Sequence, residues 1–473
     1  MPLTSSQTKR SRTTFFCNEC GHKSPKWEGR CPACDSWGTY AEAPQPTRAG
    51  RPDKGAGASR VRQALDEPAS DNKPHAPRPL AEAVAQLTQI IPTGLPETDR
   101  VLGGGLVPGA LILLAGDPGV GKSTLMLQAS ARLADAGASV LYASGEESAA
   151  QVGLRARRLG LDSNLVLFLA ETEAERLIES LEAAAPGVVI VDSIQTLSTH
   201  GAPAAGSVGA VRESAQMLMA WAKVRGVPVV LAGHVTKDGA IAGPKVLEHM
   251  VDVVLQMEGD PVSSYRILRC AKNRFGATDE VALFEMRADG LAEVADPSAA
   301  LVAERRAGVP GSAVVATLEG TRPLLAEVQA LTSLAVAGPP RRTATGIDAG
   351  RMVMLTAVLT RRAGLRLGDQ DVMVNVPGGL RIAEPASDLA VAMAIASSAR
   401  DVPLDATTVC IGEVGLNGEV RRVPQLGRRL AEAARHGFSR ALVPQGTAAE
   451  TCPGMDIVPV GSVREAMQAA MGR

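Results

Sequence analysis

The chain has 473 residues, 45% of them hydrophobic, and a formal net charge of −1. This length predicts two or three domains, and the composition excludes a disordered chain and a globally basic nucleic-acid binder. The first twelve residues lack the apolar stretch of a secretory signal, and no apolar run approaches ~18 residues, so we expect a cytoplasmic protein without a membrane span.

Near the N-terminus, residues 13–40 carry four of the seven cysteines in two Cys-x2-Cys pairs. Such pairs can close a tetrahedral site of four thiolates, which is typical of a structural zinc ion, and so small a module needs the metal to fold. Two redox dithiols are the alternative. The predicted zinc ligands are Cys17, Cys20, Cys31 and Cys34. Residues 41–79 are rich in Pro, Ala, Gly and Arg, and we expect them to form a flexible linker.

From residue 80 to 297, apolar runs of strand length alternate with amphipathic stretches of helix length. This alternation predicts an α/β domain with a parallel sheet. The predicted strands lie at residues 111–115, 140–143, 165–169, 188–192 and 227–232.

A glycine-rich segment directly follows the first of these strands and matches the pattern GxxxxGK[ST]. A helix-compatible stretch, residues 125–136, comes next, so the segment has the context of a P-loop rather than of an incidental turn. Its backbone N–H groups can surround phosphate oxygens beside a helix N-terminus. We expect Lys122 to contact the β- and γ-phosphates and Ser123 to bind Mg²⁺. The predicted ATP-binding residues are Gly116, Asp117, Pro118, Gly119, Val120, Gly121, Lys122, Ser123 and Thr124.

Carboxylates follow two of the predicted strands. Asp192 ends the apolar run 188–192, where it can bind the magnesium ion, although an aspartate is also common at a plain strand end. Glu146 and Glu147 follow the strand 140–143. This order resembles that of ATPases of the recombinase and ring-helicase type, in which a glutamate after the strand that follows the P-loop helix orients the attacking water. The resemblance implies this role for one of the two; we favour Glu146, with an acid at a helix N-terminus as the alternative role of Glu147.

A basic segment, Lys272-Asn-Arg274-Phe-Gly276, follows a strand candidate at residues 265–270. Residues two apart on a strand lie on one face, so Lys272 and Arg274 can act together on a phosphate. A solvated basic turn is the alternative.

Residues 298–473 form a second predicted α/β region. Strands are expected at 313–318, 371–376, 407–411 and 440–443, and helices at 349–363, 385–399 and 425–436. The stretch 341–366 is locally basic, with Asp348 as its single acidic residue. It is a candidate DNA-contacting or ring-forming surface, with Arg341 and Arg342 as candidate DNA contacts, and a plain solvated surface is the alternative.

The cysteine pairs, the linker, the P-loop, the strand ending at Asp192 and the 272–276 segment together resemble the bacterial RadA (Sms) family of DNA repair proteins along the whole chain. The resemblance implies a RecA-like P-loop ATPase core, an N-terminal zinc ribbon and a C-terminal α+β domain of the Lon protease type. It implies ATP, Mg²⁺ and structural Zn²⁺ as cofactors. It also implies a hexameric ring helicase on single-stranded and branched DNA, which promotes branch migration together with the RecA recombinase.

The same resemblance implies roles for individual residues. Lys272 and Arg274 would act in trans on the ATP of a neighbouring subunit, and His234 would sense the γ-phosphate, with a strand-end histidine as the alternative. The loops 198–211 and 236–245 would line a central channel, the second with Lys237 and Lys245, although both can be ordinary surface loops. Sequence-independent phosphate contacts of this kind depend strongly on salt.

The C-terminal region resembles the Lon protease fold but departs from it at the catalytic positions. Ala386 stands where the nucleophilic serine is expected, and Ser387 is one residue away. Arg429 stands where the catalytic lysine is expected, and an arginine remains protonated and cannot act as that base. We therefore expect no peptidase activity. An ATP-dependent Lon-type protease and a RecA-like regulatory ring that does not translocate are the rival hypotheses.

Overall fold

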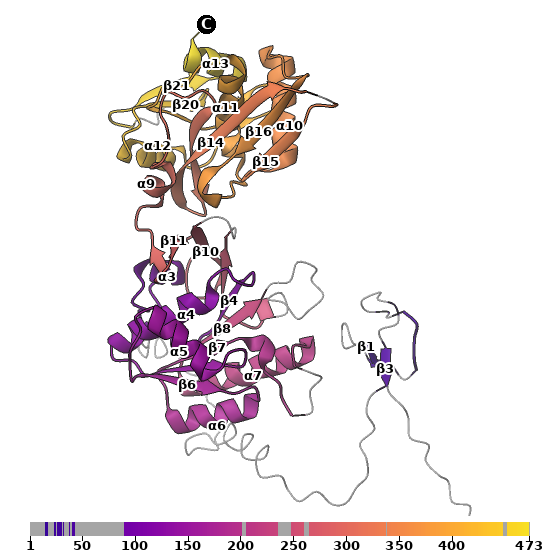
Figure 1. The fold of residues 1–473 in the computed structure, drawn as a ribbon, viewed down its shortest axis with the longest axis vertical. Coiled ribbons are helices and arrows are strands. Elements are labelled where there is room, and N and C mark those ends of the chain that lie inside the picture. The colour runs from indigo at the N-terminus through magenta and orange to yellow at the C-terminus, as the bar shows by residue number, and fades with distance from the viewer. Residues whose placement is uncertain are drawn as a thin grey trace, which may run out of the picture. The chain divides into compact units, whose positions relative to one another are not determined.

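The computed structural model describes residues 15–17, 23–24, 26–30, 32, 37, 40–42, 89–200, 205–234, 247–259, 264–336, 338–447 and 452–472 (Figure 1). The chain divides into two compact units. The first comprises Met1–Gly94, Gly105–Pro118 and Lys122–Leu255, and the second comprises Leu95–Gly104, Gly119–Gly121 and Gln256–Arg473. Among the described residues, no helix combines the length and the apolar character needed to cross a membrane.

The N-terminal segment contains a small antiparallel sheet of three strands in the order β2-β1-β3. Its strands are β1 (Phe15–Cys17), β2 (Lys23–Ser24) and β3 (Tyr40–Glu42), with Cys17 opposite Tyr40. The backbone of Cys17 thus ends β1. The other three predicted zinc ligands, Cys20, Cys31 and Cys34, lie outside the described residues.

The first unit is built on a parallel sheet with the strand order β4-β8-β7-β5-β6. The strands are β4 (Leu111–Gly116), β5 (Val140–Ser144), β6 (Val166–Ala170), β7 (Val188–Asp192) and β8 (Val229–His234). All five were predicted, with bounds that differ by at most two residues. Helices cover both faces of such a sheet, which explains why its central strands are continuous apolar runs.

The helices of this unit are α4 (Lys122–Asp135), α5 (Ala149–Arg158), α6 (Ala174–Ala184) and α7 (Val208–Arg225). One cluster joins the apolar side chains of α6 and α7 to Leu111, Leu113, Leu141 and Val191 of the sheet. Alternate residues of a strand face opposite sides, so Tyr142 and Asp192 belong to the other face, the one that α4 contacts.

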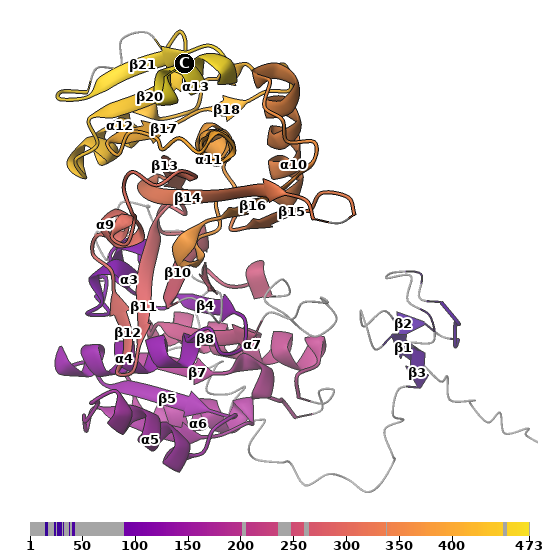
Figure 2. The same cartoon turned by 45° about the horizontal axis from the view of Figure 1, so that its top comes forward.

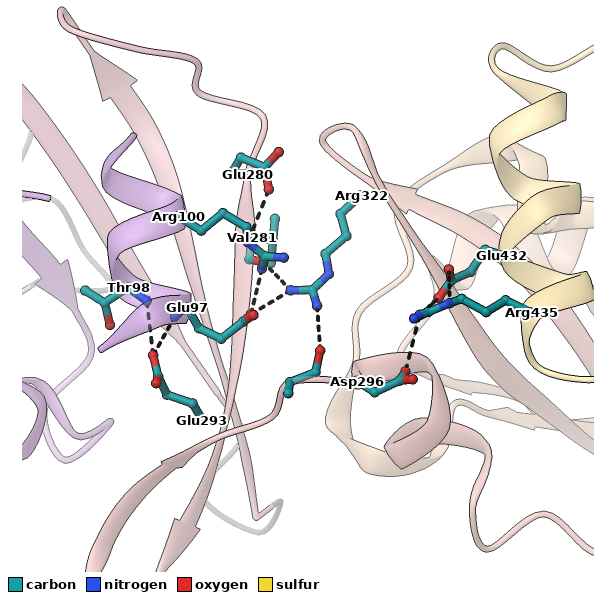
Figure 3. Close-up of polar contacts among 11 residues, drawn as sticks. Glu97, Thr98, Arg100, Glu280, Val281, Glu293, Asp296, Arg322, Glu432 and Arg435 are labelled. Atoms are coloured by element: carbon teal, nitrogen blue, oxygen red, sulfur yellow. Dashed lines mark hydrogen bonds and ion pairs between the residues drawn. The ribbon is translucent and has the colours of Figure 1, made fainter. Parts of the chain in front are cut away.

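The second unit begins with an antiparallel meander of β10 (Tyr265–Asn273), β11 (Val281–Arg287) and β12 (Gly290–Glu293). Helix α3 (Pro96–Leu102) lies against β10 and β11. Its N-cap residue Leu95 offers no side-chain acceptor, and Glu293 instead accepts hydrogen bonds from the backbone N–H groups of Glu97 (2.7 Å) and Thr98 (3.2 Å) (Figure 3). A residue of β12 thus caps a helix almost two hundred positions earlier in the chain.

Arg322, at the start of β14 (Arg322–Leu334), extends the polar network around α3 (Figure 3). Its Nη1 donates to the Glu97 carboxylate at 2.7 Å and to the Val281 carbonyl at 2.9 Å. Arg100 bonds the same carboxylate and the same carbonyl, each at 2.6 Å. Helix α3, the meander and β14 are therefore held together by hydrogen bonds with at least one charged partner, which are stronger than neutral ones.

The rest of the second unit is a seven-stranded mixed sheet in the order β15-β16-β14-β13-β17-β20-β21, with helices packed on it (Figure 2). Helix α11 (Asp388–Arg400) is buried along most of its length, because it packs on β13, β14, α10 and α13. A helix that is buried in this way is mostly apolar around its whole circumference. The long strand β14 was not predicted, although its residues 324–328 are buried. The remaining elements are β13 (Ser312–Glu319), β15 (Arg342–Thr345), β16 (Gln370–Asn375), β17 (Thr408–Cys410), β18 (Glu413–Val414), β19 (Val420–Arg421), β20 (Arg440–Pro444), β21 (Asp456–Val460), α9 (Pro297–Val302), α10 (Ala349–Val358), α12 (Leu426–Arg435) and α13 (Val463–Met471).

Candidate functional site

The glycine-rich segment forms the turn between the end of β4 and the start of α4. Gly119 and Gly121 adopt positive φ angles of 78° and 119°, which residues with a side chain rarely adopt. Lys122 is only 4% exposed, and its Nζ donates to the carbonyls of Gly116 (2.8 Å) and Asp117 (2.9 Å). Burial lowers the pKa of Lys122, while Asp192, Glu146 and Asp117 act in the opposite direction.

Asp192 lies at the carboxyl end of β7, as predicted, and is buried. Its Oδ2 accepts a hydrogen bond of 2.7 Å from the hydroxyl of Tyr142 on the neighbouring strand β5. Burial raises the pKa of Tyr142 well above its ordinary value, and the nearby Asp192 carboxylate raises it further. The phenol is therefore a neutral hydrogen-bond donor. Sequence reasoning missed Tyr142, since a tyrosine in a strand resembles any core aromatic residue.

Glu146 follows β5 and points toward the same edge of the sheet. Ser193 donates a hydrogen bond to its carboxylate, and His234 Nε2 lies 3.2 Å from Oε1. The hydrogen bond with His234 is the largest influence on this group, and the pKa of Glu146 is lowered to about 2 even though burial acts to raise it. Glu146 is therefore an ionised carboxylate at neutral pH.

Glu147 is engaged differently from its neighbour. Its carboxylate forms an ion pair of 2.7 Å with Arg155 on α5. This contact holds the Glu147 side chain against helix α5, whereas the Glu146 side chain faces Ser193 and His234.

The imidazole of His234, at the end of β8, lies between two of the predicted site residues. Its Nδ1 is 3.1 Å from Lys122 Nζ, and its Nε2 faces Glu146. An ammonium group can only donate, so Nδ1 accepts and Nε2 carries the proton that is donated to Glu146. The ring therefore links Lys122 to Glu146.

Gly145 allows the chain to bring Glu146 to this position. A Cβ atom at residue 145 would lie 2.2 Å from Thr196 Oγ1 and 2.7 Å from Thr196 Cβ, closer than real contacts allow. The Gly145 N–H also donates to the carbonyl of Asp192 at 3.2 Å. The Ser-Gly-Glu-Glu run was the only sign of this requirement in the sequence, and sequence reasoning did not use it.

Arg266 of β10 supports the P-loop backbone within the second unit. The residue is 6% exposed, and its Nε donates to the carbonyl of Val120 at 3.1 Å. This contact was not predicted, because nothing in the sequence of β10 distinguishes Arg266 from Arg269.

Lys272 and Arg274 lie at the end of β10 and in the turn that follows. Lys272 is half-buried, and Arg274 is exposed. Asn273 between them shapes this turn: its Oδ1 accepts from the N–H of Phe275 at 2.9 Å, and its Nδ2 donates to the carbonyl of Leu102 at 3.2 Å.

The described residues can supply the oxygen ligands that Mg²⁺ prefers. The Asp192 carboxylate at the sheet edge and the Ser123 hydroxyl in the first turn of α4 are hard oxygen donors of the type that binds this ion.

The candidate DNA contacts fall into two groups. Lys237 and Lys245 lie outside the described residues. Arg341 is exposed, and its backbone N–H donates to Asp371, whereas the guanidinium of Arg342 bonds the carbonyls of Leu367 and Gln370. Arg341 is thus the better placed of the two for an external phosphate.

The residues at the positions of a Lon-type catalytic pair are buried and are hydrogen-bonded or packed inside the domain. Ala386 is 1% exposed, and the Ser387 hydroxyl donates to the carbonyl of Glu384 at 2.7 Å. Arg429 is fully buried and pairs with the Glu384 carboxylate, while it also donates to the carbonyls of Ala316 (2.9 Å) and Pro424 (3.1 Å). No nucleophile and base meet among these residues.

Three family models match parts of the chain. They are described as an AAA domain (residues 76–240), the subunit ChlI of Mg-chelatase (residues 340–447) and a rubredoxin metal binding domain (residues 15–42). The last match covers the cysteine-bearing segment, as expected for the predicted zinc ribbon.

Several curated relatives match along nearly their full length. The chain is 46% identical to the DNA repair protein RadA of Halalkalibacterium halodurans, over 98% of this chain and 100% of the relative. The protein of the same name from Bacillus subtilis is 45% identical over 98% and 99%, and that from Mycolicibacterium smegmatis is 46% identical over 97% and 96%. Among solved structures, the RadB recombinase aligns with a TM-score of 0.36 and 23% identity, over 43% of this chain and all of its own.

Proposed function

The chain belongs to the RadA family of DNA repair proteins, and on this premise we propose that it is a DNA-stimulated ATPase of recombinational repair. In this proposal it assembles as a hexameric ring on single-stranded DNA. The ring acts as a helicase that promotes branch migration of recombination intermediates together with the RecA recombinase.

One observation carries the hydrolytic part of the proposal: Lys122, His234 and Glu146 form a continuous chain of contacts at the edge where Asp192 ends β7. A P-loop ATPase needs a cation for the transferred phosphoryl group and a group that orients the attacking water. Lys122 can supply the first. The ionised Glu146 can supply the second by accepting a hydrogen bond from the water.

The other residues have roles that follow from their chemistry. Ser123 and Asp192 would hold Mg²⁺, which neutralises charge on the phosphates when it is bound. His234 contacts both Lys122 and Glu146, so a phosphate that attracts Lys122 also alters the environment of Glu146. Arg274, exposed on its turn, is suited to reach the nucleotide of a neighbouring subunit, with Lys272 beside it.

Two rival functions remain to be separated from this one. A Lon-type protease is disfavoured by the buried ion pair of Arg429 and Glu384, which fills the place of a catalytic base. A regulatory RecA-like ring would hydrolyse ATP without moving along DNA. It shares the same ATPase residues and therefore differs only in what hydrolysis drives.

The deciding experiment measures ATPase activity of the full chain with and without single-stranded DNA, beside unwinding of a forked duplex. We expect DNA to stimulate hydrolysis and the fork to be unwound only with hydrolysable ATP. ATPase activity without strand displacement would favour the regulatory ring. Cleavage of fluorescent casein that is lost in Lys122→Ala would favour the protease.

A further inference from the structure

Tyr142 occupies a position from which it can orient the carboxylate of Asp192. The two residues lie on adjacent parallel strands, where Tyr142 is opposite Ile190 and Ser144 is opposite Asp192. Side chains two residues apart on a strand share a face, so the Tyr142 ring leans along the sheet toward Asp192. Its hydroxyl meets Oδ2 at 2.7 Å, and Tyr142 and Asp192 are 1% and 4% exposed.

A single donor on one carboxylate oxygen has a directional effect. An ionised carboxylate can rotate and present either oxygen, but the phenol O–H holds Oδ2 and leaves Oδ1 for another partner. Groups that hydrogen-bond to a metal ligand from behind orient it and tune its affinity for the ion. Burial strengthens the contact, because water does not compete for the hydroxyl.

We propose that Tyr142 is a positioning residue for metal binding, which holds Asp192 so that one of its carboxylate oxygens faces the magnesium ion of the nucleotide. This inference rests on the proposed ATPase function and adds a residue to it. Tyr142 touches neither the nucleotide nor the metal, and its effect passes through Asp192.

The surroundings of Tyr142 make the proposal testable with a small change. Its ring also lines a cavity of about 230 Å³ together with Leu127, Ala131, Val152 and Phe168. A phenylalanine ring fits the same space and removes only the hydroxyl. Ser130→Ala is a matched control, because it removes another buried hydroxyl, which donates to the carbonyl of Met126 at 2.8 Å on α4.

The experiment measures binding of Mn²⁺, as a spectroscopic substitute for Mg²⁺, to the full chain with ADP by electron paramagnetic resonance. We expect Tyr142→Phe to weaken Mn²⁺ binding by roughly 10- to 100-fold, the range typical of such partners, and Ser130→Ala to leave it unchanged. The Mg²⁺ concentration that half-saturates ATPase activity should rise in parallel, and kcat should recover at high Mg²⁺. A merely structural role of Tyr142 would not produce this dependence on the ion.

Asp192→Asn and the double variant Tyr142→Phe/Asp192→Asn complete the design. If Tyr142 acts through Asp192, the double variant binds Mn²⁺ no more weakly than Asp192→Asn alone. Unchanged affinity in Tyr142→Phe, with a loss in Asp192→Asn, overturns the positioning role and leaves the metal carboxylate standing. Unchanged affinity in Asp192→Asn overturns the assignment of the metal ligand itself, and the inference about Tyr142 with it. Unfolding by urea, followed in each variant, checks that the Mn²⁺ affinities are compared between folded proteins.

Discussion

His234 donates a hydrogen bond from Nε2 to the Glu146 carboxylate over 3.2 Å, and this contact joins the ends of two strands that are not neighbours in the sheet. The opposite nitrogen of the same ring accepts from Lys122. The candidate water-orienting residue and the candidate phosphate-binding residue are thus coupled through one imidazole ring.

Lys122→Ala should abolish ATP turnover. The substitution removes the cation that stabilises charge on the transferred phosphoryl group, and it leaves His234 Nδ1 without its donor. Phosphate release should fall to the background rate. Lys223→Ala is the matched control, because Lys223 is exposed on α7, and it should retain the activity of the unmodified chain. Appreciable turnover in Lys122→Ala would place the phosphate site elsewhere.

Gly145→Ala should reduce kcat by about 100-fold, because a displacement of catalytic groups by about 1 Å has an effect of this size. The new methyl group would overlap Thr196, so the segment that carries Glu146 must move. Steady-state kinetics would measure the loss, and Thr196→Gly in the same chain should restore part of it.

Gly153→Ala is the control for this glycine substitution. Gly153 lies in α5, and a Cβ atom there meets nothing within 4 Å. We expect normal kinetics and a free energy of unfolding that rises by up to about 1 kcal/mol, since alanine favours a helix. Equal kinetic losses in both variants would contradict the specific role of Gly145.

The Glu146 carboxylate should make stability depend on pH in the acid range. Its pKa in the folded protein is lowered to about 2 from an ordinary value of 4.5, chiefly by the hydrogen bond with His234. Its contribution to the free energy of unfolding is therefore present above pH 4.5 and is lost as the pH falls toward 2. The side chain is 38% exposed, so solvent screens the contact.

Urea unfolding of the unmodified chain and of Glu146→Gln at several pH values checks this prediction. The difference in stability between the two should be largest near neutral pH and should shrink below pH 4.5. Glu179→Gln, on an exposed part of α6, serves as the control and should show no such trend. A constant difference across the range would mean that Glu146 is not held in this way.

Arg274→Ala should preserve nucleotide binding and lose hydrolysis, if Arg274 acts on the ATP of a neighbouring subunit. Fluorescent nucleotide binding and phosphate release separate the two effects. Mixed with Lys122→Ala, the variant should regain partial activity, because each subunit supplies what the other lacks. Arg287→Ala, which removes another exposed arginine, should retain hydrolysis by itself. Absence of any recovery on mixing argues for action within one subunit.

Arg429→Ala should destabilise the second unit by about 3 kcal/mol, as expected when one partner of a buried ion pair is removed. Glu384 would retain its hydrogen bonds from Thr317 and the backbone of Leu318 but lose its cation. Urea unfolding measures the change. Replacing both residues by methionine should cost less, because no buried charge is then left unpaired. Neither variant should cleave casein.

Much of the fold followed from local patterns in the sequence. The strands of the parallel sheet are continuous apolar runs. The P-loop segment contains Gly119 and Gly121, which can adopt the positive φ angles that its turn requires. The preference for Glu146 over Glu147 also came from the sequence. The ion pair of Glu147 with Arg155 supports that preference, but no pattern predicted it.

The sequence by itself determined the features that depend on neighbours along the chain. These are the strands, the P-loop and the candidate residues at strand ends. Only the tertiary structure decided which of these residues meet. Tyr142 contacts Asp192 fifty positions away, His234 reaches Glu146 across the sheet edge, and Glu293 caps α3. The physical reason is that strand order and register bring distant side chains together, and neither is encoded in the spacing of residues along one strand.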